Sequence, residues 1–162
     1  SLNTYEEELH ESQIRLRIMG QIERLPSPVR KRIEKAMSQT EHYKAHTLVI
    51  ALSYGARAEI TQATQQIAQA VANGSLKPIE ISEKHITNNL YLPDIPDPEL
   101  MIRTSGELRL SNFMLWQLSY AEIVVTDTLW PDFREPQFYE ALQEFNQRKR
   151  RFGALDSTKG SS

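Results

Sequence analysis

Apolar segments with strand character alternate along the chain with segments of helical periodicity. Residues 47–52 (Thr-Leu-Val-Ile-Ala-Leu) form a continuous apolar, β-branched run, which is typical of a parallel strand covered on both faces. Residues 14–20 alternate apolar with basic side chains before a glycine, which predicts a half-buried strand. Further strands are expected at residues 100–102 and 123–126, and helices at residues 4–12, 27–43, 60–71, 112–120 and 138–145. This alternation predicts an α/β fold with a mostly parallel central sheet flanked by helices.

The composition is that of an ordinary globular chain. It has 162 residues, of which 40% are hydrophobic and 25% charged, and we expect one domain over residues 1–153 with a flexible tail over residues 154–162. The absence of cysteine excludes disulfides, thiolate nucleophiles and cysteine-bound zinc or iron. No apolar run approaches the ~20 residues that span a bilayer. We therefore expect a soluble, cytoplasmic protein that is at most peripheral to a membrane.

The charge balance argues against a nucleic-acid-binding protein. The chain has nineteen lysine and arginine residues and twenty-one aspartate and glutamate residues, so its net charge is −2 and the chain as a whole does not attract polyanions. Residues 148–151 form one basic cluster at the expected end of the last helix. There they either complement the helix dipole or bind an anionic ligand of a partner.

The turn after the predicted strand at residues 100–102 carries the best candidate site. Arg103 and Arg109 each offer a fork of donors, Ser111 offers a hydroxyl, and the amides of the expected helix would favour an anion. Together they predict a phosphate or diphosphate site, where each charge-assisted hydrogen bond is worth about 1.5 to 3 kcal/mol. The alternative is that the arginines pair with Glu107 on a solvated loop.

Three other groups of polar residues are candidate metal ligands. Glu122 could bind Mg²⁺, which takes one or two protein carboxylates and completes its shell with water and phosphate oxygens; the alternative is a surface glutamate. Asp94 and Asp97 lie among prolines that prevent a shared helix face, so we reject them as a metal motif. His42 and His46 have no third ligand nearby, so we expect them to be structural or exposed.

Longer stretches of the chain resemble the cis-prenyltransferase (undecaprenyl diphosphate synthase) family. The resemblance rests on residues 102–122 (Ile-Arg-Thr-Ser-Gly-Glu-Leu-Arg-Leu-Ser-Asn-Phe-Met-Leu-Trp-Gln-Leu-Ser-Tyr-Ala-Glu), and on residues 126–133 and 150–153. Residues 15–20 and 54–57 also fall where that family has similar segments. The likeness covers nearly the whole chain, and so it is far more specific than any short motif.

The resemblance implies a reaction and a set of binding residues. Members of the family condense isopentenyl diphosphate with an allylic diphosphate such as farnesyl diphosphate, and give a long Z-polyprenyl diphosphate such as undecaprenyl diphosphate, a lipid carrier for cell-wall synthesis. They use Mg²⁺ and work as homodimers, and Glu122 matches a residue that helps bind the metal. The positions that match substrate-binding residues are Arg103, Arg109 and Ser111, with Arg151 and Gly153 reaching across the dimer interface.

One part of the family pattern does not occur in this chain. The signature Met-Asp-Gly-Asn-Gly-Arg-Trp, which holds the catalytic aspartate, and the segment Phe-Ser-x-Glu-Asn-Trp are both absent. We therefore expect a fold that is incomplete at its N-terminus, with no catalytic residue of its own and no activity alone. The alternatives are a non-catalytic partner subunit of a prenyltransferase and an anion- or nucleic-acid-binding module.

Overall fold

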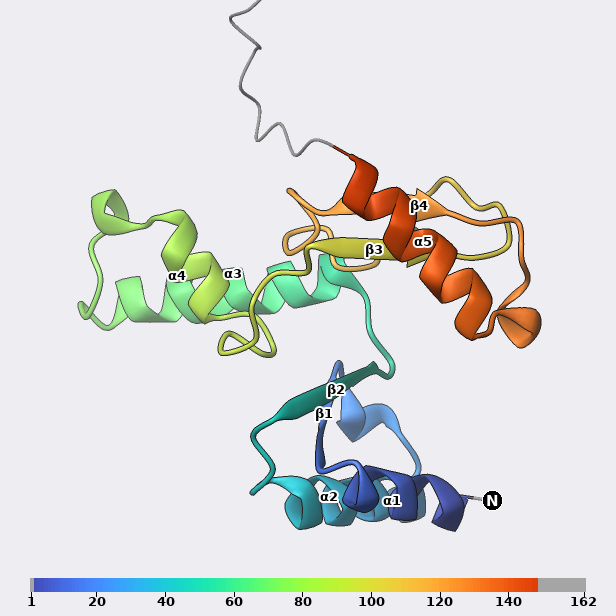
Figure 1. Cartoon of the computed structure of the whole chain (residues 1–162). Coiled ribbons are helices and arrows are strands. Elements are labelled where there is room, and N and C mark those ends of the chain that lie inside the picture. Colours follow the sequence, from blue (N-terminus) through green and yellow to red (C-terminus); the bar gives the residue numbers. More distant parts are fainter. Residues whose placement is uncertain (1, 149–162) are drawn as a thin grey trace, which may run out of the picture. The chain divides into compact units, whose positions relative to one another are not determined.

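A computed structural model of the chain describes residues 2–148, and the contacts within the chain divide it into two compact units, with the boundary in the sequence between Ile95 and Pro96. Each unit contains one pair of parallel strands, and the single domain expected over residues 1–153 stays a prediction. The first unit contains α1 (Leu2–Glu11), β1 (Ile14–Met19), α2 (Ser27–Thr40), β2 (His46–Ala51), α3 (Ala56–Ala72) and α4 (Glu83–Asn88) (Figure 1). The second contains β3 (Leu100–Arg103), β4 (Glu122–Val125) and α5 (Glu135–Gln147). Among residues 2–148, no helix combines the length and apolar character that a membrane crossing needs.

The first unit is organised around the parallel pair β1 and β2. Their register places Leu16 beside Leu48 and Ile18 beside Ile50, so the apolar side chains of both strands share one face. Helices α1 and α2 lie together against this pair (Figure 1). An apolar hollow of about 570 Å³ lies between the helices and the strands. Its lining is mainly aliphatic and includes Ile14, Leu16, Ile18, Ile33, Leu48 and Ile50.

The prediction that the strand at residues 47–52 is covered on both faces is wrong. Leu48 and Ile50 are 43% and 39% exposed. Both side chains border the hollow, so α1 and α2 flank this face without sealing it. The apolar run identified the strand correctly, but it did not show how much of each face the neighbouring helices would cover.

The carboxyl ends of β1 and β2 are held together by an unusually close backbone approach. The amide of Leu52 donates to the carbonyl of Met19 at 2.9 Å, and Gly20 adopts a φ of +129°. A Cβ atom on Gly20 would lie 2.0 Å from the carbonyl oxygen of Leu52. Only glycine fits this position, because the space and the backbone conformation both exclude a side chain.

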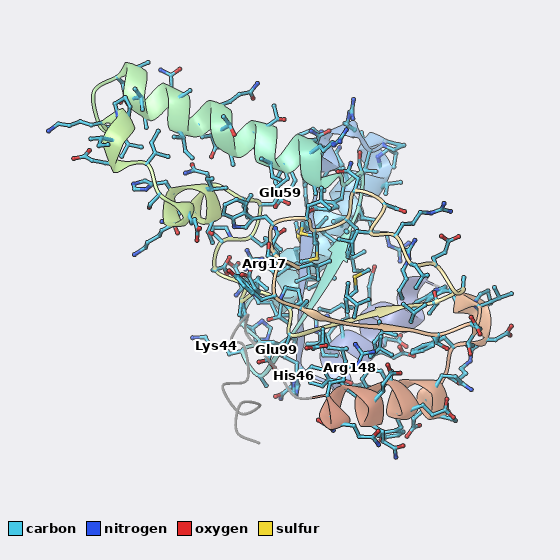
Figure 2. All side chains as sticks on the ribbon, turned by 90° about the horizontal axis from the view of Figure 1, so that it is seen from above. Arg17, Lys44, His46, Glu59, Glu99 and Arg148 are labelled. Atoms are coloured by element: carbon cyan, nitrogen blue, oxygen red, sulfur yellow. The ribbon has the colours of Figure 1, made fainter. Side chains whose placement is uncertain are left out.

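A buried carboxylate connects the turn after β2 with the segment after α4. Glu59, in the first turn of α3 (Figure 2), is only 1% exposed. The hydroxyl of Tyr54 donates to it at 2.6 Å and the amide of Tyr91 at 3.0 Å. These bonds satisfy a charge that would otherwise be costly to bury, and they fix both chain segments to α3.

An ion pair on the same unit leads to a pH-dependence prediction. Arg17 donates to both carboxylate oxygens of Asp94, at 2.8 and 3.1 Å, and these bonds hold the pKa of Asp94 below its ordinary value. Because the folded pKa is lowered, the pair stabilises the fold above the ordinary aspartate pKa and this contribution is lost as the pH falls through the lowered value. We expect Arg17→Gln to return the Asp94 pKa toward normal in an NMR titration, whereas Arg30→Gln should not. An unchanged Asp94 titration in Arg17→Gln would show that the pair does not form.

The second unit is a parallel pair, β3 and β4, with α5 packed against β4 (Figure 1). Leu100 lies opposite Glu122, and Arg103 lies opposite Val125. The helix predicted at residues 112–120 is wrong, because this segment forms a series of turns. Ser111, Asn112 and Met114 all have positive φ values, which a right-handed helix does not allow.

Candidate functional site

Arg103 is the last residue of β3 and lies at the carboxyl end of the β3–β4 pair. Its carbonyl accepts from the amide of Thr126 at 2.9 Å, which fixes its backbone beside the end of β4. Its Nε is buried and has no hydrogen-bond partner among residues 2–148. A buried donor without an acceptor is costly, and such a group at the end of a parallel strand is suited to an anionic ligand.

The turn that follows Arg103 is hydrogen-bonded to the segment after β4. Ser105 and Gly106 have φ values of +66° and +64°, and their amides donate to the carbonyls of Thr128 and Thr126 at 3.0 and 2.9 Å. A Cβ atom on Gly106 would lie 2.9 Å from Oδ1 of Asp127. These amides are therefore engaged by backbone. The sequence predicted that the amides at the start of a following helix would favour an anion, but no helix follows this turn.

Arg109 pairs with Glu107 on an exposed loop, which is the alternative to a phosphate site that the sequence left open. Its side chain is 75% exposed and binds Glu107 through two contacts, Nε to Oε2 at 2.9 Å and Nη2 to Oε1 at 3.1 Å. Ser111 is also exposed. Within the described part of the chain, Arg103 and Arg109 share no common partner. Arg109 must therefore leave Glu107, or bind alongside it, before it can contact a diphosphate.

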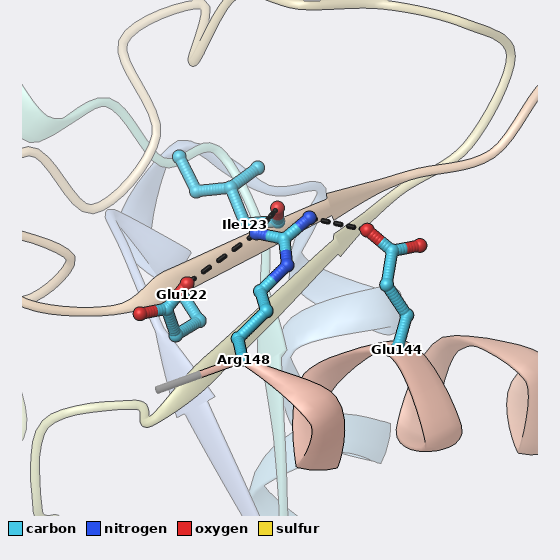
Figure 3. Close-up of polar contacts among 4 residues, drawn as sticks. All are labelled: Glu122, Ile123, Glu144 and Arg148. Atoms are coloured by element: carbon cyan, nitrogen blue, oxygen red, sulfur yellow. Dashed lines mark hydrogen bonds and ion pairs between the residues drawn. The ribbon is translucent and has the colours of Figure 1, made fainter. Parts of the chain in front are cut away.

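Glu122 is the first residue of β4 and forms an ion pair with Arg148, whose Nη1 lies 3.3 Å from Oε2 (Figure 3). No group of three or more His, Cys, Asp or Glu side chains suited to a metal occurs between residues 2 and 148. One carboxylate fits Mg²⁺ only where water and phosphate oxygens complete the shell. Arg148 contacts Oε2 of Glu122, so Oε1 is the oxygen that remains available to a metal ion.

Two of the predicted binding residues, Arg151 and Gly153, lie outside the described residues. Of the basic cluster at residues 148–151, the structure describes Arg148, whose guanidinium binds Glu122, Glu144 and the carbonyl of Ile123. This arginine is committed to contacts within the chain, so Arg148 itself is not free to bind a nucleic-acid phosphate.

Two features of the structure were not predicted from the sequence. One is the apolar hollow beside β1 and β2; the alternation of apolar side chains in residues 14–18 and 48–50 gave the signal for its lining, although not for its depth. The other is the contact from Arg148 to Glu122. The spacing of Glu144 and Arg148 predicts an ion pair on one helix, but the residues of β4 are too distant in sequence to be found in this way.

The chain matches known proteins over most of its length. The prenyltransferase family model, which describes undecaprenyl diphosphate synthases, covers residues 1–153. An isoprenyl transferase of Bacillus subtilis (strain 168) is 49% identical over 154 residues, which are 95% of this chain and 59% of the relative. An isoprenyl transferase of Heliobacterium mobile is 47% identical over 147 residues, 91% of this chain and 56% of the relative. The chain thus spans a little over half the length of these curated relatives.

Solved structures give the same assignment. A crystal structure described as a probable undecaprenyl diphosphate synthase from Campylobacter jejuni has a TM-score of 0.80 and 38% identity, and the match covers 94% of this chain and 69% of that one. Lavandulyl diphosphate synthase from Lavandula x intermedia, in complex with dimethylallyl diphosphate, has a TM-score of 0.86 and 35% identity over 92% of this chain and 64% of that one. The α/β fold class and the resemblance found in the sequence are both confirmed. The chain therefore belongs to the cis-prenyltransferase (undecaprenyl diphosphate synthase) family.

Proposed function

We propose that this chain supplies the isopentenyl diphosphate site of a cis-prenyltransferase. The reaction joins isopentenyl diphosphate to an allylic diphosphate such as farnesyl diphosphate, and extends it to a Z-polyprenyl diphosphate such as undecaprenyl diphosphate. The observation that carries the proposal is the buried Nε of Arg103, which has no partner in the described part of the chain. The names of the relatives support the same reaction class.

In this proposal, Arg103 is the principal ligand of the isopentenyl diphosphate. A guanidinium matches two oxygens of a phosphate at once, so it fixes the position of the diphosphate and, through it, that of the attached double bond. Arg109 and Ser111 follow on the same loop as additional contacts. The exposed, paired state of Arg109 makes its contribution smaller than that of Arg103, because its ion pair with Glu107 must be rearranged first.

The hollow in the first unit is suited to a hydrocarbon chain. Its lining is predominantly aliphatic, from Ile14, Leu16 and Ile18 on β1 and from Leu48 and Ile50 on β2. Its volume of about 570 Å³ lies in the range of small-molecule sites. We assign it to the isoprenoid part of the allylic substrate or product. The allylic diphosphate bound to the lavender enzyme supports this substrate class.

The chemistry proceeds by loss of diphosphate from C1 of the allylic substrate. The double bond of isopentenyl diphosphate attacks C1, a new carbon–carbon bond forms, and C2 of the isopentenyl unit loses a proton to the released diphosphate, which leaves the Z double bond. Bound Mg²⁺, with Glu122 as one ligand, would neutralise charge on the diphosphate oxygens. The role of this chain's residues is to bind and orient the isopentenyl substrate.

The assembly and location of the protein are also proposals. We propose a homodimer, in which Arg151 and Gly153 reach the partner's substrate, and a cytoplasmic protein with peripheral membrane contact. The support for these is the family resemblance and the lipid nature of the product.

Turnover assays test the proposed function. We expect this 162-residue chain to bind isopentenyl diphosphate but not to consume it with farnesyl diphosphate and Mg²⁺. A fusion of this chain to the N-terminal part of the Bacillus subtilis relative is expected to be active. Turnover by this chain alone would contradict the expected inactivity, and failure of both forms to bind isopentenyl diphosphate would contradict the proposed function.

A further inference from the structure

Arg148 connects the end of α5 with the start of β4 through three contacts (Figure 3). Its Nη1 donates to the carbonyl of Ile123 at 2.7 Å and to Oε2 of Glu122 at 3.3 Å. Its Nη2 donates to Oε1 of Glu144, one turn earlier on the helix. We call these four residues, Glu122, Ile123, Glu144 and Arg148, the Arg148 cluster.

This arrangement differs from an ordinary ion pair on a helix surface. On α2, Arg30 and Glu34 have the same spacing and lie 3.7 Å apart, and the pair is confined to its own helix. Arg148 also binds a main-chain carbonyl and a carboxylate on a strand 25 and 26 residues away in sequence. A backbone acceptor does not change rotamer as a side chain does, so it fixes the guanidinium in space.

The fork of Arg148 in turn restricts the carboxylate of Glu122. Glu144 holds Nη2, and the carbonyl of Ile123 holds Nη1, so the donor that faces Glu122 has a fixed position. Oε2 of Glu122 is directed to that donor, which leaves Oε1 as the oxygen available for another ligand. Lysine has no planar fork, and so it cannot span the three acceptors in this way.

We propose that Arg148 is the positioning residue for Glu122: it selects one orientation of the Glu122 carboxylate and ties β4 to the end of α5. The inference rests on the proposed function for its consequence, because an oriented Glu122 matters only where that carboxylate contributes to binding of the substrate diphosphate. Arg148 itself does not touch the substrate. Its effect on binding must therefore pass through Glu122.

The first experiment uses this chain without any ligand. Three-bond couplings of the Glu122 side chain are expected to show one χ1 rotamer in the original chain and averaging in Arg148→Gln. Amide hydrogen exchange in β4 and in the last turn of α5 is expected to accelerate about fivefold in that variant, the effect of one lost hydrogen bond. Arg30→Gln is the matched control and should change neither readout. Arg148→Lys keeps the charge and should give an intermediate result, and it replaces Arg148→Gln if that variant does not fold.

The second experiment measures the affinity for isopentenyl diphosphate with Mg²⁺ present. Arg148→Gln and Glu122→Gln should each weaken binding, and the double variant should bind no more weakly than Glu122→Gln alone. Unchanged Glu122 couplings in the first experiment, or fully additive losses in the second, would overturn the proposal. If the original chain binds no isopentenyl diphosphate, the proposed function fails, while the couplings and the exchange rates still decide whether Arg148 orients Glu122.

Discussion

Replacing Gly20 with alanine is expected to lower the free energy of unfolding of the first unit by about 3 kcal/mol or more, a loss typical of strain at a special backbone position. The added Cβ would lie 2.0 Å from the carbonyl oxygen of Leu52. That oxygen belongs to the backbone at the end of β2, so the clash cannot be relieved by rotating a side chain. The φ of +129° adds a conformational cost of its own.

Gly74→Ala is the matched control for this prediction. Gly74 also has a positive φ, +79°, but a Cβ atom added there would meet nothing within 4 Å. It should therefore lose only the conformational term, about 1 kcal/mol. Chemical denaturation of both variants separates the two causes. A loss in Gly20→Ala no larger than that in Gly74→Ala would show that the ends of β1 and β2 are not as close as described.

Replacing Arg103 with glutamine is expected to raise the dissociation constant for isopentenyl diphosphate about 30-fold, equivalent to about 2 kcal/mol. The reason is that a charge-assisted donor to the diphosphate is removed from a buried position. Stability should respond differently: because the buried Nε has no protein partner in residues 2–148, no protein hydrogen bond of this atom is lost, and the free energy of unfolding should not fall by more than about 1 kcal/mol.

Arg109→Gln provides the comparison within the same loop. Its guanidinium is 75% exposed and already paired with Glu107, so we expect a weakening of less than about fivefold, in the range of surface ion pairs. Isothermal titration of both variants measures the contrast. Equal losses for the two arginines would favour the symmetric two-arginine site that the sequence suggested.

Much of the fold could be predicted from periodicity alone. The alternation at residues 14–18 and the apolar run at residues 47–52 gave β1 and β2 almost to the residue, since strand periodicity is a local property. The segment at residues 112–120 failed because its apolar spacing suits a helix, whereas the left-handed conformations of Ser111, Asn112 and Met114 depend on the surrounding structure.

The candidate site was only partly predictable, because it too depends on the surrounding structure. The residue types and their place after a strand indicated the loop at residues 103–112 as the place for an anion. Sequence could not show that Arg103 buries an unpaired Nε while Arg109, six positions later, lies in solvent with Glu107. Burial and pairing depend on contacts between distant segments, as the bond between Arg148 and Ile123 also illustrates.

The sharpest test of the diphosphate site is the NMR signal of the Arg103 Nε–H during titration with isopentenyl diphosphate. We expect this signal to shift downfield along the binding curve, as the buried donor gains a charged acceptor. A signal that stays in place at saturation, while those of other arginines move, would contradict the assignment of Arg103 as the diphosphate ligand.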